Sequence, residues 1–313
     1  MTQYAFFQGQ IVPIEQAKIS VMTHALNYGT ACFGGLRGYW NGDSGQLFVF
    51  RILDHYRRFL NSARLLMIEL PYSADDLAEI TLDLVRQETW REDVYIRPLA
   101  YKADTGIGVR LHDLTAAVTI FSLPFGCYIK REEGAHVSFS SWRRVDDNAI
   151  PARGKISGSY VNSALAKSEA VLNGFDEALV LNANGHLAEG SAENVFIVRD
   201  GVGITPPITD NILEGITRNT VMHLLRSELR VEVVERPIDR TEVYLADEAF
   251  FCGTGVQIVA IARVDHRPIG NGSMGPITAR LRDLYFGIVR GRNEAYRHWC
   301  TPVYAERTIS SLA

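Results

Sequence analysis

The sequence has few cysteines and no long apolar run, and each shortage excludes a class of protein. The four cysteines, Cys32, Cys127, Cys252 and Cys300, are scattered, with no C-x-x-C pair and no histidine at metal-ligand spacing. We therefore expect reduced thiols, with neither a disulfide framework nor a metal site. No segment is long and apolar enough to span a bilayer, and the first residues lack the pattern of a secretory signal. These absences predict a cytoplasmic protein without a membrane partner.

The sequence also lacks an excess of charge of one sign. Its 313 residues include 32 Lys and Arg and 36 Asp and Glu, which gives a net charge of −4, and the basic residues are dispersed. A nucleic-acid partner is not expected from such a distribution. Hydrophobic residues make up 47% of the chain, which suffices for a large core and, at this length, favours two domains.

Several common motifs are absent as well. Gly154-Lys155 is not a phosphate-binding P-loop, because Ile156 follows where Ser or Thr is required. Gly106-Ile107-Gly108 lacks the third glycine of a dinucleotide fingerprint. Neither G-x-S-x-G nor H-E-x-x-H occurs, so the hydrolase and metalloprotease classes lose support.

Strand and helix patterns fall into blocks without regular alternation, which favours an α+β fold. In the first half, strands are predicted at 4–7, 36–40, 46–50, 94–101 and 116–123, with helices from Asp54 and from a capping box at Ser73 and Asp76. In the second half, strands are predicted at 136–141, 177–181, 194–198, 203–205, 231–234, 248–251 and 256–264, with helices ending at 172, starting near 216, and covering 240–245 and 277–289. A break in the pattern predicts a linker at 123–133, between a small domain at 1–122 and a large one at 134–313.

Lys155 lies in a small-residue loop before an apolar helix and is the leading catalytic candidate. A lysine amine is a nucleophile only when neutral, so its usual pKa of about 10.4 must be lowered by burial or by a nearby cation, which Arg153 could supply. The alternative is an ordinary solvated loop lysine.

Two short segments could hold an anion. Gly215-Ile216-Thr217-Arg218 opens an amphipathic helix whose first amides would face the anion, although Thr217 could instead only cap the helix. Cys252-Gly253-Thr254-Gly255 is a small-residue turn between strands that could present amides and a hydroxyl. Arg58, on the first predicted helix, could add a cation or remain a solvated charge.

Two further pairs of polar residues are candidates. Glu189 and Glu193 lie four apart in a small-residue segment, where an acid either points inward or is an exposed edge charge. Tyr95 and Arg97 share one strand face, because side chains alternate with period two. A phenol beside a guanidinium suits a carboxylate ligand, and the alternative is a plain surface pair.

In order and spacing, these segments resemble the fold type IV pyridoxal-phosphate enzymes, and most closely the branched-chain amino-acid aminotransferases. The resemblance covers roughly residues 5 to 290. The matching stretches are 23–29, 33–37, 54–58, 95–99, 150–160, 188–196, 213–218 and 252–254. It implies a small α/β domain and a larger pseudo-barrel domain with the site between them, in a homodimer or a multiple of it.

The resemblance also implies roles for residues that bind pyridoxal 5'-phosphate. Lys155 would bond covalently to the cofactor and move the substrate proton, Tyr160 would contact the 3′-oxygen, and Glu189 the pyridine nitrogen. Glu193 matches a family acid that does not touch that nitrogen. The phosphate would be held by Arg58, Ile216, Thr217 and Thr254.

For the substrate, the resemblance implies that Tyr95 and the backbone near Gly255 receive the α-carboxylate, and Arg97 the distal carboxylate of glutamate or 2-oxoglutarate. Tyr28, Phe33 and Tyr128 would line the side-chain pocket. One position departs from the family pattern, since Gly34 stands where these enzymes usually have Glu. This leaves Arg37 without an obvious partner and able to reach a substrate carboxylate. The loop around Arg110 is also more polar than an aliphatic pocket suggests.

The resemblance predicts transfer of the amino group of leucine, isoleucine or valine to 2-oxoglutarate. Gly34 and the polar loop around Arg110 leave an alternative function on the same fold, that of an (R)-selective amine or D-amino-acid transaminase. Aminodeoxychorismate lyase resembles the same scaffold and is a second alternative, and a binding protein that has lost turnover is a third. Lys155, Glu189 and Arg58 together argue against the last.

Overall fold

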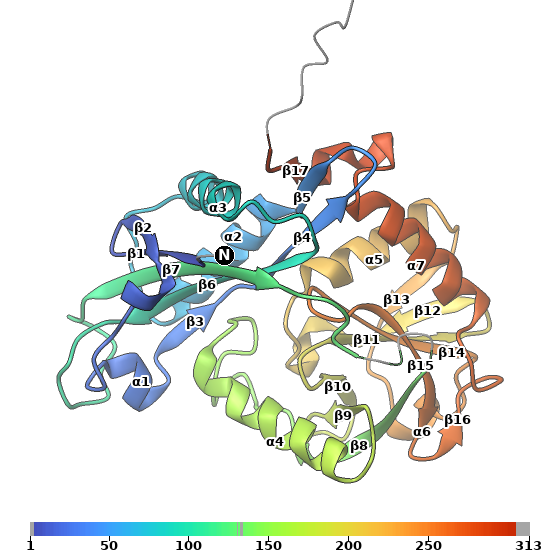
Figure 1. The fold of residues 1–313 in the computed structure, drawn as a ribbon. Helices are drawn as coiled ribbons and strands as arrows, with labels where there is room; N and C mark the ends of the chain where they lie inside the picture. The colour runs from blue at the N-terminus through green and yellow to red at the C-terminus, as the bar shows by residue number, and fades with distance from the viewer. Residues whose placement is uncertain (1–2, 130, 132–133, 305–313) are drawn as a thin grey trace, which may run out of the picture.

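A computed structural model describes residues 3–129, 131 and 134–304, which form two β-sheets with helices packed against them (Figure 1). Parts of the predicted linker, at 130 and 132–133, and the outer ends of both predicted domains, at 1–2 and 305–313, lie outside the described residues. Within the described residues, no helix has the length and apolar character needed to cross a membrane.

The first sheet has eight strands in the order β17-β5-β4-β6-β7-β1-β2, with β3 beside β6, and its neighbours are antiparallel. Helices α2 and α3 pack against it through apolar residues at helical spacing, among them Tyr56, Phe59 and Leu84. The predicted capping box of Ser73 and Asp76 begins α3. The elements are β1 (Tyr4–Phe7), β2 (Gln10–Pro13), α1 (His24–Tyr28), β3 (Ala31–Phe33), β4 (Leu36–Asn41), β5 (Gln46–Phe50), α2 (Ile52–Leu65), α3 (Ala74–Glu88), β6 (Val94–Lys102), β7 (Ala116–Pro124) and β17 (Cys300–Pro302).

The second sheet has nine strands in the order β10-β9-β8-β15-β14-β11-β12-β13, with β16 beside β15. Its pairs are parallel at β8/β9, β8/β15 and β12/β13 and antiparallel elsewhere. The elements are β8 (Ala135–Arg143), α4 (Tyr160–Leu172), β9 (Glu177–Leu181), β10 (Leu187–Gly190), β11 (Asn194–Arg199), β12 (Val202–Thr205), α5 (Ile216–Ser227), β13 (Val233–Glu235), α6 (Arg240–Val243), β14 (Glu248–Gly253), β15 (Gln257–Val264), β16 (Arg267–Pro268) and α7 (Pro276–Val289).

The second sheet must curl, and the reason lies in one short turn. Strand β10 ends at Gly190 and β11 begins at Asn194, although five neighbour steps separate these strands in the sheet order. Five steps in a flat sheet would span about 24 Å, whereas the four Cα–Cα links from 190 to 194 reach about 15 Å at most. The sheet therefore bends back on itself, and the turn at 191–193 lies where its two parts approach each other.

The predicted α+β class is confirmed, and most predicted strands and helices form. Strands β2, β3, β10 and β17 and helix α1 were not predicted, because elements of three to five residues carry little periodic signal and are stabilised by distant partners. The strand predicted at 231–234 forms at Val233–Glu235, where it pairs with β12.

The two sheets are joined by a shared core. Tyr39 and Phe48 of the first sheet pack in one buried cluster with Tyr285 and Ile288 of α7. Strand β17 then returns to pair with β5, with Cys300 opposite Phe50. These contacts fix the first sheet relative to the second.

Candidate active site

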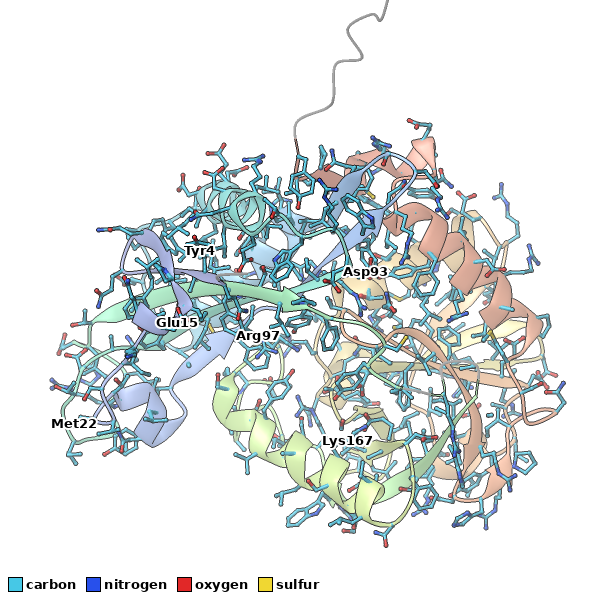
Figure 2. All side chains as sticks on the ribbon, in the orientation of Figure 1. Tyr4, Glu15, Met22, Asp93, Arg97 and Lys167 are labelled. Atoms are coloured by element: carbon cyan, nitrogen blue, oxygen red, sulfur yellow. The ribbon has the colours of Figure 1, made fainter. Side chains whose placement is uncertain are left out.

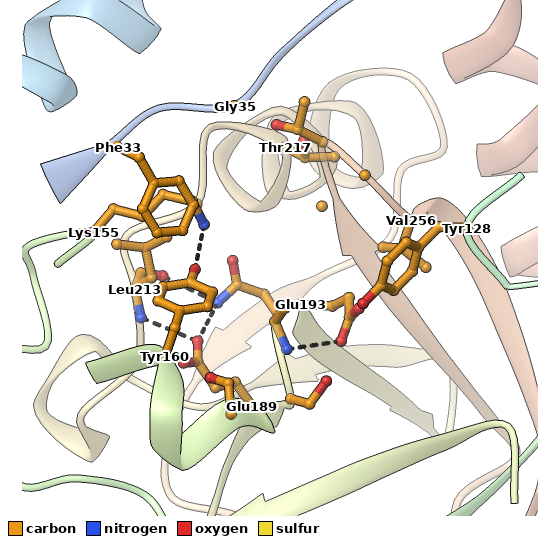
Figure 3. Close-up of a pocket in the computed structure, with 18 of the residues that line it drawn as sticks. Phe33, Gly35, Tyr128, Lys155, Tyr160, Glu189, Glu193, Leu213, Thr217 and Val256 are labelled. Carbon is orange, nitrogen blue, oxygen red and sulfur yellow. Dashed lines mark hydrogen bonds between the residues drawn. The ribbon is translucent and has the colours of Figure 1, made fainter. Parts of the chain in front are cut away.

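A cavity of about 720 Å³ is lined by residues of both sheets (Figure 3). Most of the residues singled out in the sequence converge on it, from segments more than 200 positions apart. Tyr28 and Arg37 are not among its lining residues. Those that line it are Phe33, Arg58, Tyr95, Arg97, Tyr128, Lys155, Tyr160, Glu189, Glu193, Ile216, Thr217, Thr254 and Gly255.

Lys155 is held at three atoms. Its amide donates a hydrogen bond to Ser62 Oγ at 3.1 Å, and its carbonyl accepts one from the Phe33 amide at 2.9 Å. Its Nζ lies 2.5 Å from the Tyr160 hydroxyl, and a dashed line marks this hydrogen bond in Figure 3. The backbone of the lysine is thus fixed by the first half of the chain, while its amine points into the cavity.

The environment of Lys155 favours a neutral amine. Burial, followed by the nearby Arg58 guanidinium, lowers the pKa of Lys155 to about 7, against a weaker opposing effect of Glu189. The prediction that Arg153 supplies the cation was wrong. Arg153 is half exposed and forms ion pairs with Asp147 and Glu214 at 3.5 and 3.3 Å.

Glu189 is buried at the cavity wall and points inward, so the exposed-edge alternative was wrong. Its Oε1 pairs with Arg144 Nε at 2.9 Å, and its Oε2 accepts hydrogen bonds from the Leu213 amide at 3.1 Å and from Asn194 Nδ2 at 3.4 Å. Burial raises the pKa of Glu189, and Arg144 counters that rise. The arrangement presents a fixed carboxylate with a charged partner behind it.

Glu193 is also buried and lines the cavity. Its Oε2 accepts a hydrogen bond from the Ala192 amide at 3.0 Å. Burial, followed by the neighbouring Glu177 carboxylate, holds the pKa of Glu193 well above its usual range. Glu177 itself is paired with Lys167 at 2.6 Å. Burial and Glu177 therefore both favour the protonated form of Glu193.

The residues of the predicted anion cradle line one cavity together. Helix α5 begins at Ile216 after Gly215, so Thr217 lies inside the first turn and is not the cap. Thr254 lies in the turn between β14 and β15. The Arg58 guanidinium donates to the Glu214 carbonyl at 3.2 Å. A first helical turn, hydroxyls and a guanidinium suit a phosphate.

Arg97 and Tyr95 face the cavity together, as their strand alternation predicts. Arg97 Nη2 donates to the Tyr95 hydroxyl at 3.3 Å, and its guanidinium lies 4.5 Å from the Phe33 ring centre. Figure 2 shows Arg97 on the side of the first sheet that faces α4. Within the described residues, the buried Arg97 Nε has no hydrogen-bond partner. A guanidinium with unused donors suits a carboxylate.

Arg37 has partners, contrary to the expectation from Gly34. It is buried, and its guanidinium donates to the carbonyls of Gly255, Phe125 and Gly126 at 2.8, 2.8 and 2.7 Å. It thereby connects β4 to residues of the predicted linker and to the Gly255 turn. A Cβ at Gly34 would lie 2.6 Å from Pro98 Cγ, so a larger residue there requires Pro98 to shift.

Gly35, which the sequence did not single out, lets Tyr95 reach the cavity. A Cβ at this position would lie 2.0 Å from the Tyr95 hydroxyl, so any side chain would displace the phenol. Tyr28 instead contacts the loop before Arg110, since its hydroxyl accepts a hydrogen bond from the Gly108 amide at 3.2 Å. Tyr128 lines the cavity, and its ring lies 5.5 Å from Lys167 Nζ.

The comparison with known families decides what this arrangement is. Residues 33–264 match the family model described as amino-transferase class IV. The chain belongs to the class IV aminotransferases. A probable branched-chain-amino-acid aminotransferase of Aquifex aeolicus (strain VF5) is 52% identical over 301 residues, which are 96% of this chain and 97% of the relative.

Solved structures agree with this class IV aminotransferase over nearly its full length. The branched-chain amino acid aminotransferase of Thermobaculum terrenum in its PLP-form superposes with a TM-score of 0.93 and 43% identity, covering 97% of this chain and 99% of that one. The branched-chain aminotransferase of the thermophilic archaeon Thermoproteus uzoniensis with norvaline also has a TM-score of 0.93 and 43% identity, with coverages of 97% and 100%. The recognised family and fold type are confirmed.

Sequence reasoning missed several residues of this aminotransferase that support the site. Arg144 pairs with Glu189 from the end of β8, and Ser62 bonds the Lys155 amide from α2. Asn194 and the Leu213 amide complete the surroundings of Glu189. The residue types at these positions carry no local signal for these roles, because each acts on a residue distant in sequence.

Proposed function

We propose that the chain is a pyridoxal-phosphate-dependent branched-chain amino-acid aminotransferase that moves the amino group of leucine, isoleucine or valine to 2-oxoglutarate. The observation that carries the proposal is the buried Lys155 amine, with its pKa near 7, in one cavity with the Glu189 carboxylate and the α5 anion cradle. The names of the Aquifex aeolicus relative and of the two solved structures support the substrate class.

The residues of the cavity fit this cofactor. Arg58, Thr254 and the first turn of α5 would hold the phosphate, Glu189 the pyridine nitrogen and Tyr160 the 3′-oxygen. When bound, pyridoxal phosphate supplies a carbonyl carbon that bonds amines and a pyridine ring that withdraws electrons from the substrate Cα. The Arg144 cation favours an ionised Glu189, and a carboxylate there would favour a protonated pyridine nitrogen.

Lys155 would act both as the amine that anchors the cofactor and as the base that moves the substrate proton. An amine with a pKa near 7 is partly neutral at neutral pH, and it gains and gives protons with little driving force in either direction. The Tyr160 hydroxyl, 2.5 Å away, orients the amine toward the cavity.

We propose that the substrate carboxylates bind at the part of the cavity wall formed by Tyr95, Arg97 and Gly255. The Tyr95 hydroxyl and the backbone at Gly255 would take the α-carboxylate, and Arg97 the distal carboxylate of glutamate. Phe33 and Tyr128 would contact a branched side chain. Tyr28 and Arg37 would act from outside the cavity, Arg37 by holding the Gly255 carbonyl.

The test is a set of half-reactions with the cofactor-loaded chain. L-leucine, L-isoleucine and L-valine should bleach the cofactor absorbance, and 2-oxoglutarate should restore it. Borohydride reduction should attach the cofactor to Lys155. Turnover only with D-alanine or (R)-1-phenylethylamine would replace this proposal by the amine or D-amino-acid transaminase that Gly34 suggests. Release of pyruvate from an aminodeoxychorismate substrate without an acceptor would instead indicate the lyase.

We further propose that the site lies between a domain at 1–122 and one at 134–313, and that two copies of the chain associate. Exposed apolar side chains lie on α1 and on the loop at 104–114, which the Tyr28–Gly108 contact joins. Leu26 is 62% and Val109 77% exposed. Such a surface favours a protein partner.

We also propose that the protein works in the cytoplasm. The chain has four free thiols, three of them buried, and free thiols fit a reducing compartment.

The association is testable by analytical ultracentrifugation. Leu26→Asp combined with Val109→Asp should shift the sedimentation coefficient to that of a monomer, because charges would replace the apolar contact. Leu245→Asp, at a 68% exposed position on the second half, is the matched control. A double variant that sediments like the wild type would contradict this surface.

A further inference from the structure

Ser62 has no part in the chemistry above, yet its hydroxyl is bonded to two site residues. It lies on α2 and is 1% exposed. Its Oγ donates a hydrogen bond to the Arg58 carbonyl at 3.0 Å and accepts one from the Lys155 amide at 3.1 Å. A serine inside a helix commonly donates to the carbonyl four residues earlier. Here the same hydroxyl oxygen also accepts a hydrogen bond from the backbone amide of the reactive lysine.

The surroundings leave little room for this segment to move. Cys32 and Ile156 pair as an isolated bridge, and the Gly158 amide donates to the Gly29 carbonyl at 3.2 Å. A Cβ at Gly154 would lie 2.9 Å from Leu65 Cδ1, so the loop passes close to α2. Ser62 lies one turn before Leu65 on that helix, where this close approach brings the Lys155 amide within hydrogen-bonding distance.

We propose that Ser62 is a positioning residue for the reactive lysine: its hydroxyl fixes the Lys155 backbone to the helix that carries Arg58, and so sets how closely the lysine amine and the guanidinium approach. The proposal rests on the proposed function of Lys155 as the reactive amine. According to this proposal, Ser62, in the first half of the chain, controls the position of Lys155, in the second half.

Loss of the hydroxyl has a defined consequence. The Lys155 amide would be left buried without an acceptor, and a buried unsatisfied amide drives its segment toward water. The two largest causes of the low Lys155 pKa, burial and the nearby Arg58, would then weaken. The pKa of Lys155 should therefore rise from about 7 toward that of an ordinary lysine.

The experiment compares full-length Ser62→Ala with the wild type. The chain has five lysines, Lys18, Lys102, Lys130, Lys155 and Lys167, so reductive methylation with ¹³C-formaldehyde gives few NMR signals, each assignable by a Lys→Arg change. Titration of the cofactor-freed chain measures the Lys155 pKa. The pH profile of kcat/KM is recorded on the loaded chain. Ser62→Ala should raise the Lys155 pKa and lower kcat/KM about tenfold, the scale of one lost hydrogen bond.

Thr81→Val is the matched control, because Thr81 is buried on α3 and bonds Tyr56 of α2 without contacting the lysine segment. It should leave the Lys155 titration unchanged. Ser62→Thr, which keeps the hydroxyl, should retain the low Lys155 pKa. If Ser62→Ala does not fold, Ser62→Cys keeps the volume with a weak acceptor and should shift the pKa in the same direction.

Two results would overturn the proposal. An unchanged Lys155 titration in the Ser62 variants would show that the hydroxyl does not position the amine, and equal shifts in Thr81→Val would show a general packing effect. Failure of the proposed function is separate: a wild-type chain without transaminase turnover still reports the Lys155 titration.

Discussion

At the scale of single residues, the site contains ionisable groups whose pKa values depend on burial and on charged neighbours. Lys155, Glu189 and Glu193 are ionisable groups in one cavity, and burial shifts the pKa of each toward its neutral form. The partners differ: Arg58 repels the Lys155 cation, Arg144 stabilises the Glu189 anion, and Glu177 opposes ionisation of Glu193. Within one cavity, the pKa of the base is lowered and the pKa of each acid is raised, while Arg144 limits the rise for Glu189.

Lys155→Met should stabilise the chain that lacks cofactor. The pKa of Lys155 is about 7 in the folded chain and about 10.4 when unfolded. Between these values the unfolded chain binds more protons, so wild-type stability rises with pH there, and the buried cation costs most below pH 7. We expect Lys155→Met to gain on the order of a few kcal/mol at pH 7 and below, and progressively less toward pH 10. Urea unfolding across this range measures the gain, and a gain that grew with pH would contradict the prediction.

Glu189→Gln should impair both stability and turnover, for separable reasons. It leaves the nearly buried Arg144 without its counter-ion, which costs about 3 kcal/mol. It also removes the charge that we propose lies beside the pyridine nitrogen, and we expect kcat to fall roughly a hundredfold.

Adding Arg144→Met to Glu189→Gln should recover much of the stability, because the unpaired charge is gone, but not the turnover. Denaturant unfolding and steady-state rates on the same samples separate the two effects. Recovery of turnover in the double variant would show that Glu189 acts only as the partner of Arg144.

At the scale of elements, short turns place the chemistry. The turn at 191–193 closes the curled sheet between Glu189 and Asn194, and the first turn of α5 presents its amides next to Arg58. Both are segments whose backbone is fixed by the strands or helix that flank them. Residues at the ends of strands and helices would thus bind the cofactor, while the middle parts of the helices pack in the hydrophobic core.

Thr217→Val should weaken cofactor binding. It removes one hydroxyl from the proposed phosphate site while keeping the shape of the side chain, and a hydrogen bond to a charged group corresponds to roughly a 10- to 100-fold change in Kd. Equilibrium dialysis against pyridoxal phosphate measures it. Ser227→Ala, which removes the Ser227 hydroxyl bond to the His223 carbonyl at the far end of α5, is the control and should not change Kd. Equal Kd values for all three proteins would exclude Thr217 from the site.

At the scale of the whole molecule, one arginine ties separate parts of the chain together. Arg37, on β4, holds the carbonyls at 125 and 126 and at 255. The Gly255 turn lies beside the proposed substrate carboxylate, so its position depends on a residue 218 positions earlier. Packing between α7 and the first sheet reinforces this connection.

Arg37→Lys should loosen these connected segments. An ammonium cannot bond the three carbonyls as the guanidinium does, so the variant should lose about 2 kcal/mol of stability. Hydrogen exchange should quicken at 125–128 and 253–256, and KM for both substrates should rise. If Arg37 instead binds a substrate carboxylate directly, KM would rise with no change in exchange.

The sequence by itself determined the fold class, the family, and most strands and helices, and it singled out the residues that we propose as reactive groups. Hydrophobic periodicity, glycine turns and capping residues act locally. The segments that contain Lys155, Glu189 and the Gly215–Thr217 turn can therefore be recognised from the sequence. Only the tertiary structure decided which charges act on them. Arg58 lowers the Lys155 pKa in place of the adjacent Arg153, Arg144 pairs with Glu189, and Arg37 bonds backbone carbonyls. Electrostatic and hydrogen-bonding effects depend on distance through space, and neighbours along the chain need not be neighbours in the fold.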